Sequence, residues 1–202
     1  MRTQNFGFEI EMTGLTRCAA AKIIAGHFGS EAVHVGGGYD AYAVRDERNR
    51  QWKVMSDASI RCQNRRGETE STLYSVEVVS PICQYRDIET IQELIRKLRT
   101  GGAKVNKSCG IHVHVDASNH TPQTLRNLVN IMAAKEDLLY KTLQVDVARE
   151  DYCKKADTQF LDVLNRKRPK AMQDLETLWY NGSSGRYRHY DHTRYHALNL
   201  HS

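Results

Sequence analysis

Two segments of the chain alternate between apolar and polar residues. The first covers residues 5–13 and reads NFGFEIEMT, and the second covers residues 109–116 and reads CGIHVHVD. Because successive side chains of a strand point to opposite faces, each segment is predicted to be a strand with one apolar face. Shorter apolar runs predict further strands around Tyr42–Val44, around Trp52–Val54 and over Leu73–Ser80.

Other segments repeat their apolar residues at helical spacing. Thr16 and Asp87 can cap the first two helices, Gly101-Gly102 can end the second, and Pro122 suits the first turn of the third. Helices are predicted over residues 16–28, 87–98 and 121–143, and, with Pro169 as one interruption, over residues 151–180.

A final strand is predicted over Tyr195–Leu200. The order of all these elements predicts an α+β fold, with a mostly antiparallel sheet and helices packed on one face. No internal repeat and no linker long enough to divide the chain is visible, so residues 1–202 are expected to form a single domain.

The composition narrows the function classes. Hydrophobic residues make up 40% and charged residues 26%, which is typical of a globular protein rather than a disordered one. The net charge of +5 suits an anionic ligand such as a nucleotide, but the chain lacks the dense basic stripe of a nucleic-acid-binding protein. No sustained heptad pattern indicates an oligomeric state, which therefore stays open.

The distribution of cysteines and apolar residues bears on the compartment. The five cysteines form no CxxC pair, which argues against a zinc knuckle or a disulfide framework and favours reduced thiols in a cytoplasmic protein. The N-terminus has no apolar stretch like that of a signal peptide, and charges interrupt the longest apolar runs, so no membrane span is expected.

The first candidate site residues are Glu9 and Glu11, which share one face of the first strand about 7 Å apart along the chain. On a solvated surface they would only repel each other mildly. If they line a cavity they need cations, and hard ions such as Mg²⁺ or Mn²⁺ suit carboxylate oxygens. Both interpretations remain open at this point.

Three further strands carry candidate ligands. His112 and His114 share the polar face of their strand, either as incidental histidines of an edge strand or as metal ligands. Glu77 is a lone carboxylate in an apolar strand and needs a partner, which is either a metal ion or an arginine. Asp57 follows a strand end, where aspartate is usually a turn residue. Arg194 is either a phosphate-binding arginine or an ordinary surface residue.

Together these segments resemble the amidoligase family. The chain contains, in this order, FGFEIEM, a W-x-V-x-x-D-x-S-I motif, VEVVSPI, CGIHVHVD and RYxxLNL, from residue 6 to residue 200. The family is similar to the catalytic domains of glutamine synthetase and glutamate–cysteine ligase. The resemblance therefore implies an antiparallel sheet curved into a funnel, with the active site on its concave face.

The resemblance also implies roles for individual residues and ligands. Carboxylates and one imidazole would bind the divalent metal, both histidines and an arginine would bind the ATP phosphates, and an arginine and an aspartate would act in catalysis. The implied metal ligands are Glu9, Glu11, Glu77 and His114; the implied cofactor-binding residues are His112, His114 and Arg194; the implied catalytic residues are Arg194 and Asp57.

The implied activity is ATP-dependent joining of an amino-acid or peptide carboxylate to an amine through an acyl phosphate, with Mg²⁺ or Mn²⁺. The chain has no Walker A loop, Rossmann glycine pattern or kinase motif, so nucleotide binding is expected to depend on metal ions held by the sheet. Two departures from the family pattern are Ala58, where glycine is common, and the expected lack of a final strand. A metal-dependent hydrolase and a non-catalytic binding module are the alternatives.

Overall fold

The computed structural model describes residues 2–182, 185–188 and 191–201. It divides the chain into two compact units, residues 1–116 and residues 117–202. The first unit contains the sheet and the second contains short helices, so the chain has the α+β fold that the sequence predicts. That all 202 residues act as one catalytic domain stays a prediction.

The described part of the first unit contains a six-stranded sheet in which every neighbouring pair is antiparallel. Its strand order is β2-β3-β4-β5-β1-β6, so the N-terminal strand lies between β5 and β6. The strands are β1 (Phe6–Met12), β2 (Ala32–Gly36), β3 (Ala41–Arg45), β4 (Gln51–Met55), β5 (Val76–Val79) and β6 (Ile111–Val115).

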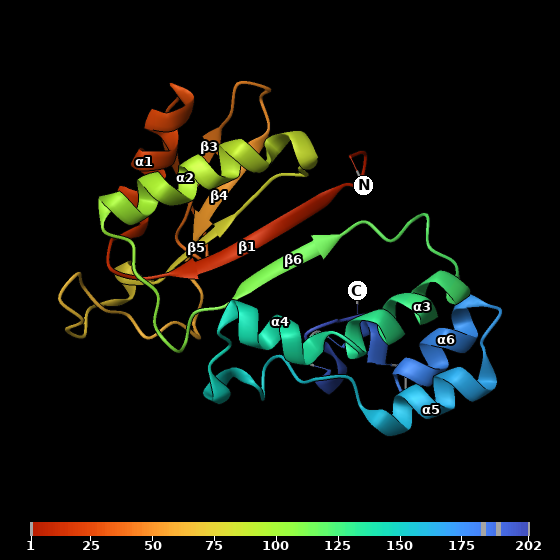
Figure 1. Cartoon of the computed structure of the whole chain (residues 1–202). Helices are drawn as coiled ribbons and strands as arrows, with labels where there is room; N and C mark the ends of the chain where they lie inside the picture. The colour runs from red at the N-terminus through yellow and green to blue at the C-terminus, as the bar shows by residue number, and fades with distance from the viewer. Residues whose placement is uncertain (1, 183–184, 189–190, 202) are drawn as a thin grey trace. The chain divides into compact units, whose positions relative to one another are not determined.

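Two helices, α1 (Arg17–Phe28) and α2 (Ile88–Gly101), pack on one face of this sheet (Figure 1). The core lies between the helices and the sheet, and Trp52 is its largest fully buried side chain. The Trp52 ring contacts Phe8 and Phe28 at centroid distances of 5.8 and 5.6 Å, and its Nε1–H donates to Asp46 at 3.2 Å. The alternation of β1 and β4 therefore gives each of these strands one apolar face that is buried against the helices, as predicted.

The ends of both helices follow from their sequences, with one exception. The Thr16 hydroxyl accepts the Ala19 N–H at 3.3 Å, and Gly102 ends α2 in a left-handed conformation with φ of 111°. The prediction that the Asp87 side chain caps α2 is wrong. Asp87 instead accepts the Gln84 N–H at 2.8 Å in a preceding 3₁₀ turn and binds Arg50.

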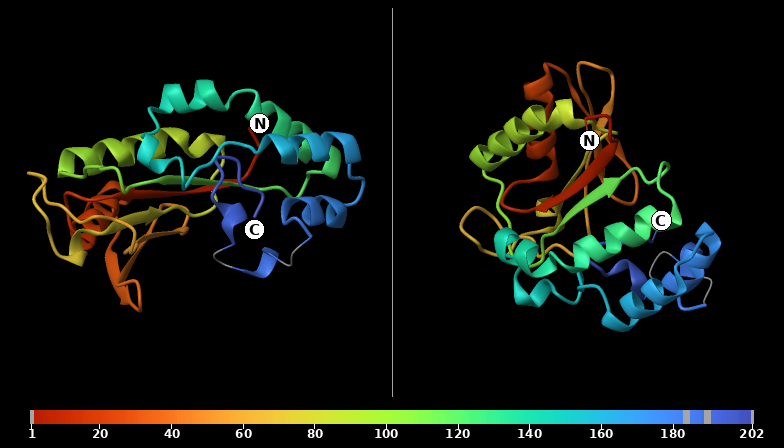
Figure 2. Two further views of the ribbon diagram at one scale, coloured as in Figure 1. Left: turned by 90° about the horizontal axis from the view of Figure 1, so that it is seen from below. Right: turned by 45° about the vertical axis from the view of Figure 1, so that its right-hand side comes forward.

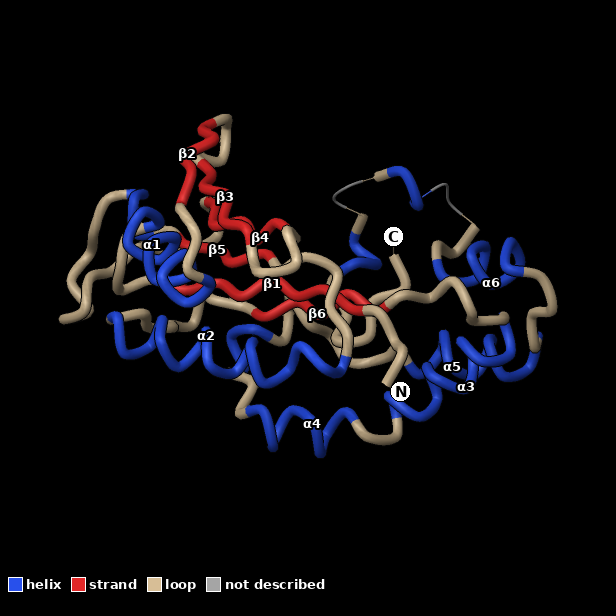
Figure 3. Tube along the Cα trace, turned by 90° about the horizontal axis from the view of Figure 1, so that it is seen from above, coloured by secondary structure: helices blue, strands red, loops and turns tan. Residues whose placement is uncertain are grey.

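The sheet is curved, with the hairpin of β2 and β3 rising steeply from the plane of β1, β5 and β6 (Figures 2 and 3). The β5 strand is shorter than predicted, because residues 72–74 form a 3₁₀ turn before it. The edge strand β6 has its apolar side chains 56–68% exposed. The face of the sheet opposite α1 and α2 carries Glu9, Glu11 and Glu77, and we call it the carboxylate face.

The second unit contains α3 (Pro122–Ala133), α4 (Glu136–Leu143), α5 (Thr158–Lys167) and α6 (Met172–Trp179). Its core is a cluster of Leu125, Val129, Leu164 and Leu175. The predicted continuous helix over residues 121–143 is wrong, since the chain breaks at residues 134–135. The break makes Glu136 the first residue of α4, where its buried carboxylate accepts the Ala156 N–H at 2.9 Å.

The predicted strand over Tyr195–Leu200 is also wrong. Its only ladder contact among the described residues is an isolated bridge between His196 and Lys154. Leu198 and Leu200 pack against the helical cluster instead, so their alternation reflects contact with helices. Across the described residues, no helix has both the length and the apolar composition that crossing a bilayer requires.

Replacing Trp52 tests this account of the core. We expect Trp52→Ala to lower the free energy of unfolding by about 3–5 kcal/mol, because it leaves a cavity between Phe8 and Phe28. The matched control is Val33→Ala on the edge strand β2, 54% exposed, for which we expect a loss under about 1 kcal/mol. Denaturation followed by circular dichroism measures both losses. Equal losses would contradict the assignment of Trp52 to the centre of the core.

Candidate functional site

Strand register brings the carboxylates of the first unit together. In the β1–β5 pair Glu11 lies directly opposite Glu77, and in the β1–β6 pair Glu9 lies opposite His112. Directly opposed residues of an antiparallel pair point to the same face, with Cβ atoms about 4.5–5.5 Å apart. Two carboxylates predicted from separate motifs are therefore cross-strand neighbours on the carboxylate face.

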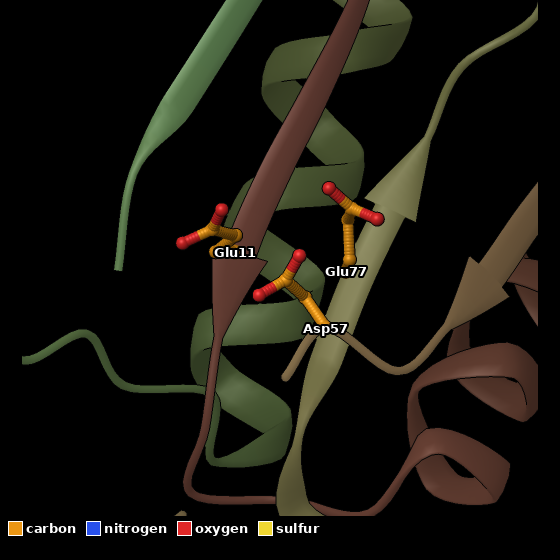
Figure 4. A group of neighbouring side chains, drawn as sticks. All are labelled: Glu11, Asp57 and Glu77. Carbon is orange, nitrogen blue, oxygen red and sulfur yellow. The ribbon is translucent and has the colours of Figure 1, made fainter. Parts of the chain in front are cut away.

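Asp57 joins these two carboxylates from the segment that follows β4. Within the described residues, the ligand oxygens of Glu11, Asp57 and Glu77 all lie within 4.8 Å of one another, and we call these residues the acidic group. Figure 4 shows the three carboxylates in front of β1 and β5, with α2 behind the strands. The acidic group therefore lies on the face of the sheet opposite the core.

Burial makes this concentration of negative charge costly. Glu11 is 4% exposed and Glu77 is 8% exposed. Burial, with added repulsion from Glu9, Asp57 and Glu11, raises the pKa of Glu77 to about 7. A divalent cation between the carboxylates would remove this repulsion, so the donors and their electrostatics fit a hard metal ion such as Mg²⁺ or Mn²⁺.

The strand β6 begins next to Glu11 and holds it. Gly110 donates its backbone N–H to Glu11 Oε2 at 2.7 Å, and its carbonyl accepts the Glu11 N–H at 3.0 Å. An amide donor favours the ionised carboxylate and fixes its direction. The CGIHVHVD motif therefore contributes to the acidic group through its glycine backbone as well as carrying the two histidines.

Glu9 has a different environment from Glu11. Its two carboxylate oxygens contact His112 Nδ1 at 3.0 Å and His114 Nε2 at 3.3 Å. The His112 hydrogen bond lowers the pKa of Glu9, and the same bond raises the pKa of His112. Glu9, His112 and His114 thus form a neighbouring pairing on the carboxylate face, and the metal-ligand roles of Glu9 and His114 stay predictions.

Arg194 belongs to the second unit. It is the last residue of a 3₁₀ turn, His192–Arg194, and its guanidinium lies 6.0 Å from the centroid of the Tyr195 ring. The three residues of the acidic group all lie in the first unit, so Arg194 takes no part in bringing them together. The role of Arg194 stays a prediction.

Sequence reasoning gave Asp57 a catalytic role in orienting substrate and missed that it lies beside Glu11 and Glu77. A signal was available in the antiparallel numbering, because Lys53 pairs with Val79 and Met55 pairs with Glu77. Continuing that register by two residues places Asp57 opposite Ser75. The pairing of β4 with β5 would have predicted this neighbourhood, but the sequence does not identify which strands pair.

The carboxylate face of the first unit thus presents three clustered carboxylates beside a glutamate that bridges two histidines. No curated protein and no solved structure matches the chain. The model of a family described as "Putative amidoligase enzyme" matches residues 2–202, which supports the ligase class of enzyme. Because the match covers nearly the whole sequence, including every candidate site residue, the chain belongs to the amidoligase family.

Proposed function

We propose that this chain is an ATP-dependent carboxylate–amine ligase whose acidic group binds the divalent cation of Mg²⁺–ATP. The observation that supports this most is the cluster of Glu11, Asp57 and Glu77, with ligand oxygens within 4.8 Å of one another. Three oxygen donors on a sheet leave other coordination positions for phosphate oxygens and water, which is how Mg²⁺ usually binds nucleotide sites.

The reaction that fits these residues proceeds in two balanced steps. A carboxylate oxygen of the substrate attacks the γ-phosphorus of ATP, the bond to the β-phosphate oxygen breaks, and ADP leaves. An amine nitrogen then attacks the acyl carbon, the C–O bond to phosphate breaks, and the amine loses a proton as the amide forms. A divalent cation bound at the acidic group neutralises the charge that develops on the phosphates.

The chain's own residues have distinct parts in this scheme. We assign the cation to Glu11, Asp57 and Glu77, because their ligand oxygens cluster. We assign Glu9 to orienting the imidazoles of His112 and His114 by its contacts of 3.0 and 3.3 Å, in place of the metal-ligand roles that the sequence predicted for Glu9 and His114. The hydrogen bond to Glu9 raises the pKa of His112, and the imidazolium of His112 presents a further N–H donor that can bind a phosphate oxygen. Arg194 is the proposed contact to the transferred phosphoryl group or the substrate carboxylate.

The proposed substrates are an amino-acid or peptide carboxylate and an amine, in keeping with the amidoligase family. We also propose a cytoplasmic location. All five cysteines are free thiols, which suits a reducing compartment, and ATP is the proposed cosubstrate.

Removing one ligand tests the cation site. We expect Glu11→Gln to weaken Mn²⁺ binding at least about tenfold, because the amide keeps the Gly110 hydrogen bond but loses the charge. Glu93→Gln on the exposed side of α2 is the matched control and should bind Mn²⁺ as the parent does. Isothermal calorimetry with and without ATP measures both, and equal affinities in the two variants would refute the assignment.

The raised pKa of Glu77 predicts a pH-dependent stability of the metal-free chain. The folded carboxyl keeps its proton up to about pH 7, whereas the unfolded group ionises near 4.5. The folded state thus binds more protons between these values, so this contribution to stability is present below about pH 4.5 and is lost as the pH rises through about 7.

Glu77→Gln should therefore stabilise the metal-free chain at pH 8 by about 1–2 kcal/mol, a value reduced to allow for solvent screening. At pH 5 the variant and the parent should differ little. Urea denaturation in the presence of a chelator measures both, and a destabilised variant at pH 8 would contradict this prediction.

The activity itself is tested by ADP release. We expect ADP and phosphate to form when Mg²⁺–ATP is given with amino-acid or peptide carboxylates, and hydroxylamine to trap the acyl phosphate as a hydroxamate. Asp57→Asn should reduce the rate at least about tenfold, with Glu93→Gln unchanged. Nucleotide-independent hydrolysis by a protein that contains stoichiometric zinc would favour a hydrolase instead.

A further inference from the structure

The side chain of Ser75 forms two hydrogen bonds with the backbone of Asp57. Ser75 Oγ accepts the Asp57 N–H at 2.9 Å and donates its own hydrogen to the Asp57 carbonyl at 2.7 Å. Ser75 is 3% exposed, so both bonds are shielded from water. The backbone ladder between β4 and β5 ends at Met55 and Glu77. Beyond that point, the Ser75 hydroxyl links the two segments through its hydrogen bonds with Asp57.

Ser75 is itself held by Arg17. Arg17 Nη1 donates to the Ser75 carbonyl at 2.9 Å and to the Thr72 carbonyl at 2.5 Å, and its other nitrogens bind Asp40. Arg17 is 4% exposed. It fixes the 3₁₀ turn that precedes β5, and through that turn it fixes the backbone position of Ser75.

The position of Arg17 is unfavourable for α1 itself. Arg17 is the first residue of this helix, where the helix dipole favours negative charge, and the first turn reads RCAA without a carboxylate. Burying a guanidinium is also costly unless all its donors are bonded. Its position is therefore better explained by the three segments that it joins than by any contribution to the helix.

Asp57 needs such support more than the other two carboxylates. Glu11 and Glu77 project from paired strands, whereas Asp57 lies in the segment after β4. Its two neighbours are like charges, and their repulsion would move an unrestrained aspartate away from them. The two hydrogen bonds between Ser75 Oγ and the Asp57 backbone oppose that movement, as does the bond that the Ser59 N–H donates to Asp57 Oδ1 at 2.6 Å.

We infer that Ser75 and Arg17 are positioning residues that hold Asp57 within the acidic group, so that its carboxylate is in place before a cation binds. This inference rests on the proposed function, because it takes the acidic group as the cation site. Residues that orient a metal ligand typically change metal affinity ten- to a hundredfold when removed, roughly as much as some ligands do.

The test is a double-mutant cycle read out by Mn²⁺ affinity and by thermal unfolding. Ser75→Ala and Asp57→Asn should each weaken Mn²⁺ binding about tenfold, and the double variant should bind about as weakly as either single variant. Ser71→Ala is the matched control, because Ser71 is exposed and makes no capping bond at the start of the same 3₁₀ turn. It should leave the affinity unchanged.

A second substitution at Ser75 keeps the test decisive if Ser75→Ala does not fold. Ser75→Cys keeps a side chain of similar size with a weaker donor and acceptor, so its Mn²⁺ affinity should lie between those of the parent and Ser75→Ala. A purely structural serine would lower the unfolding temperature in these variants without lowering the Mn²⁺ affinity of the folded protein.

The outcomes separate the two proposals. If the parent binds Mn²⁺ and Asp57→Asn weakens it while folded Ser75→Ala does not, the positioning role is overturned and the cation site stands. Additive losses in the double variant would also overturn it, since they would mean that Ser75 acts independently of Asp57. Absence of Mn²⁺ binding by the parent would overturn the proposed function itself.

Discussion

The constraint on which this site depends is the direct opposition of Glu11 and Glu77 across two hydrogen-bonded strands. Like charges at opposed positions destabilise a sheet, and here both carboxylates are nearly buried. Burial, with added repulsion from Glu9, Asp57 and Glu11, raises the pKa of Glu77 to about 7. A cation bound by the two carboxylates and Asp57 would offset this repulsion, which is the physical reason for proposing a metal site at the acidic group.

The rest of the first unit makes that opposition tolerable. The same strands that carry Glu11 and Glu77 place Met12, Val76 and Val78 on the other face, where they pack with the helices around Trp52. Burial of these apolar side chains supplies stability that the repulsion between the carboxylates reduces. Alternation along β1 and β5 thus places the stabilising apolar side chains on one face of the sheet and the charged side chains on the other.

Sequence patterns predicted which face each side chain would occupy but not its cross-strand partner. Period-two alternation placed Glu9 and Glu11 together, and the motifs supported the family. The Glu11–Glu77 pairing depends on strand order and register, which local periodicity does not encode. Local periodicity also gave a wrong strand prediction at Leu198 and Leu200. Their alternation shows that both side chains are partly buried, but it does not show that they pack against helices.

The two glutamates of the first strand show how register determines chemistry. Glu9 faces His112 on β6, and its carboxylate oxygens contact His112 and His114. At the next position on the same face, the residue of CGIHVHVD beside Glu11 is Gly110, which offers a backbone N–H and no side chain. Glu11 is therefore oriented by a backbone donor, whereas Glu9 is oriented by contacts with two imidazoles. Two identical residues, two positions apart, thus have different surroundings because a histidine lies beside one and a glycine beside the other.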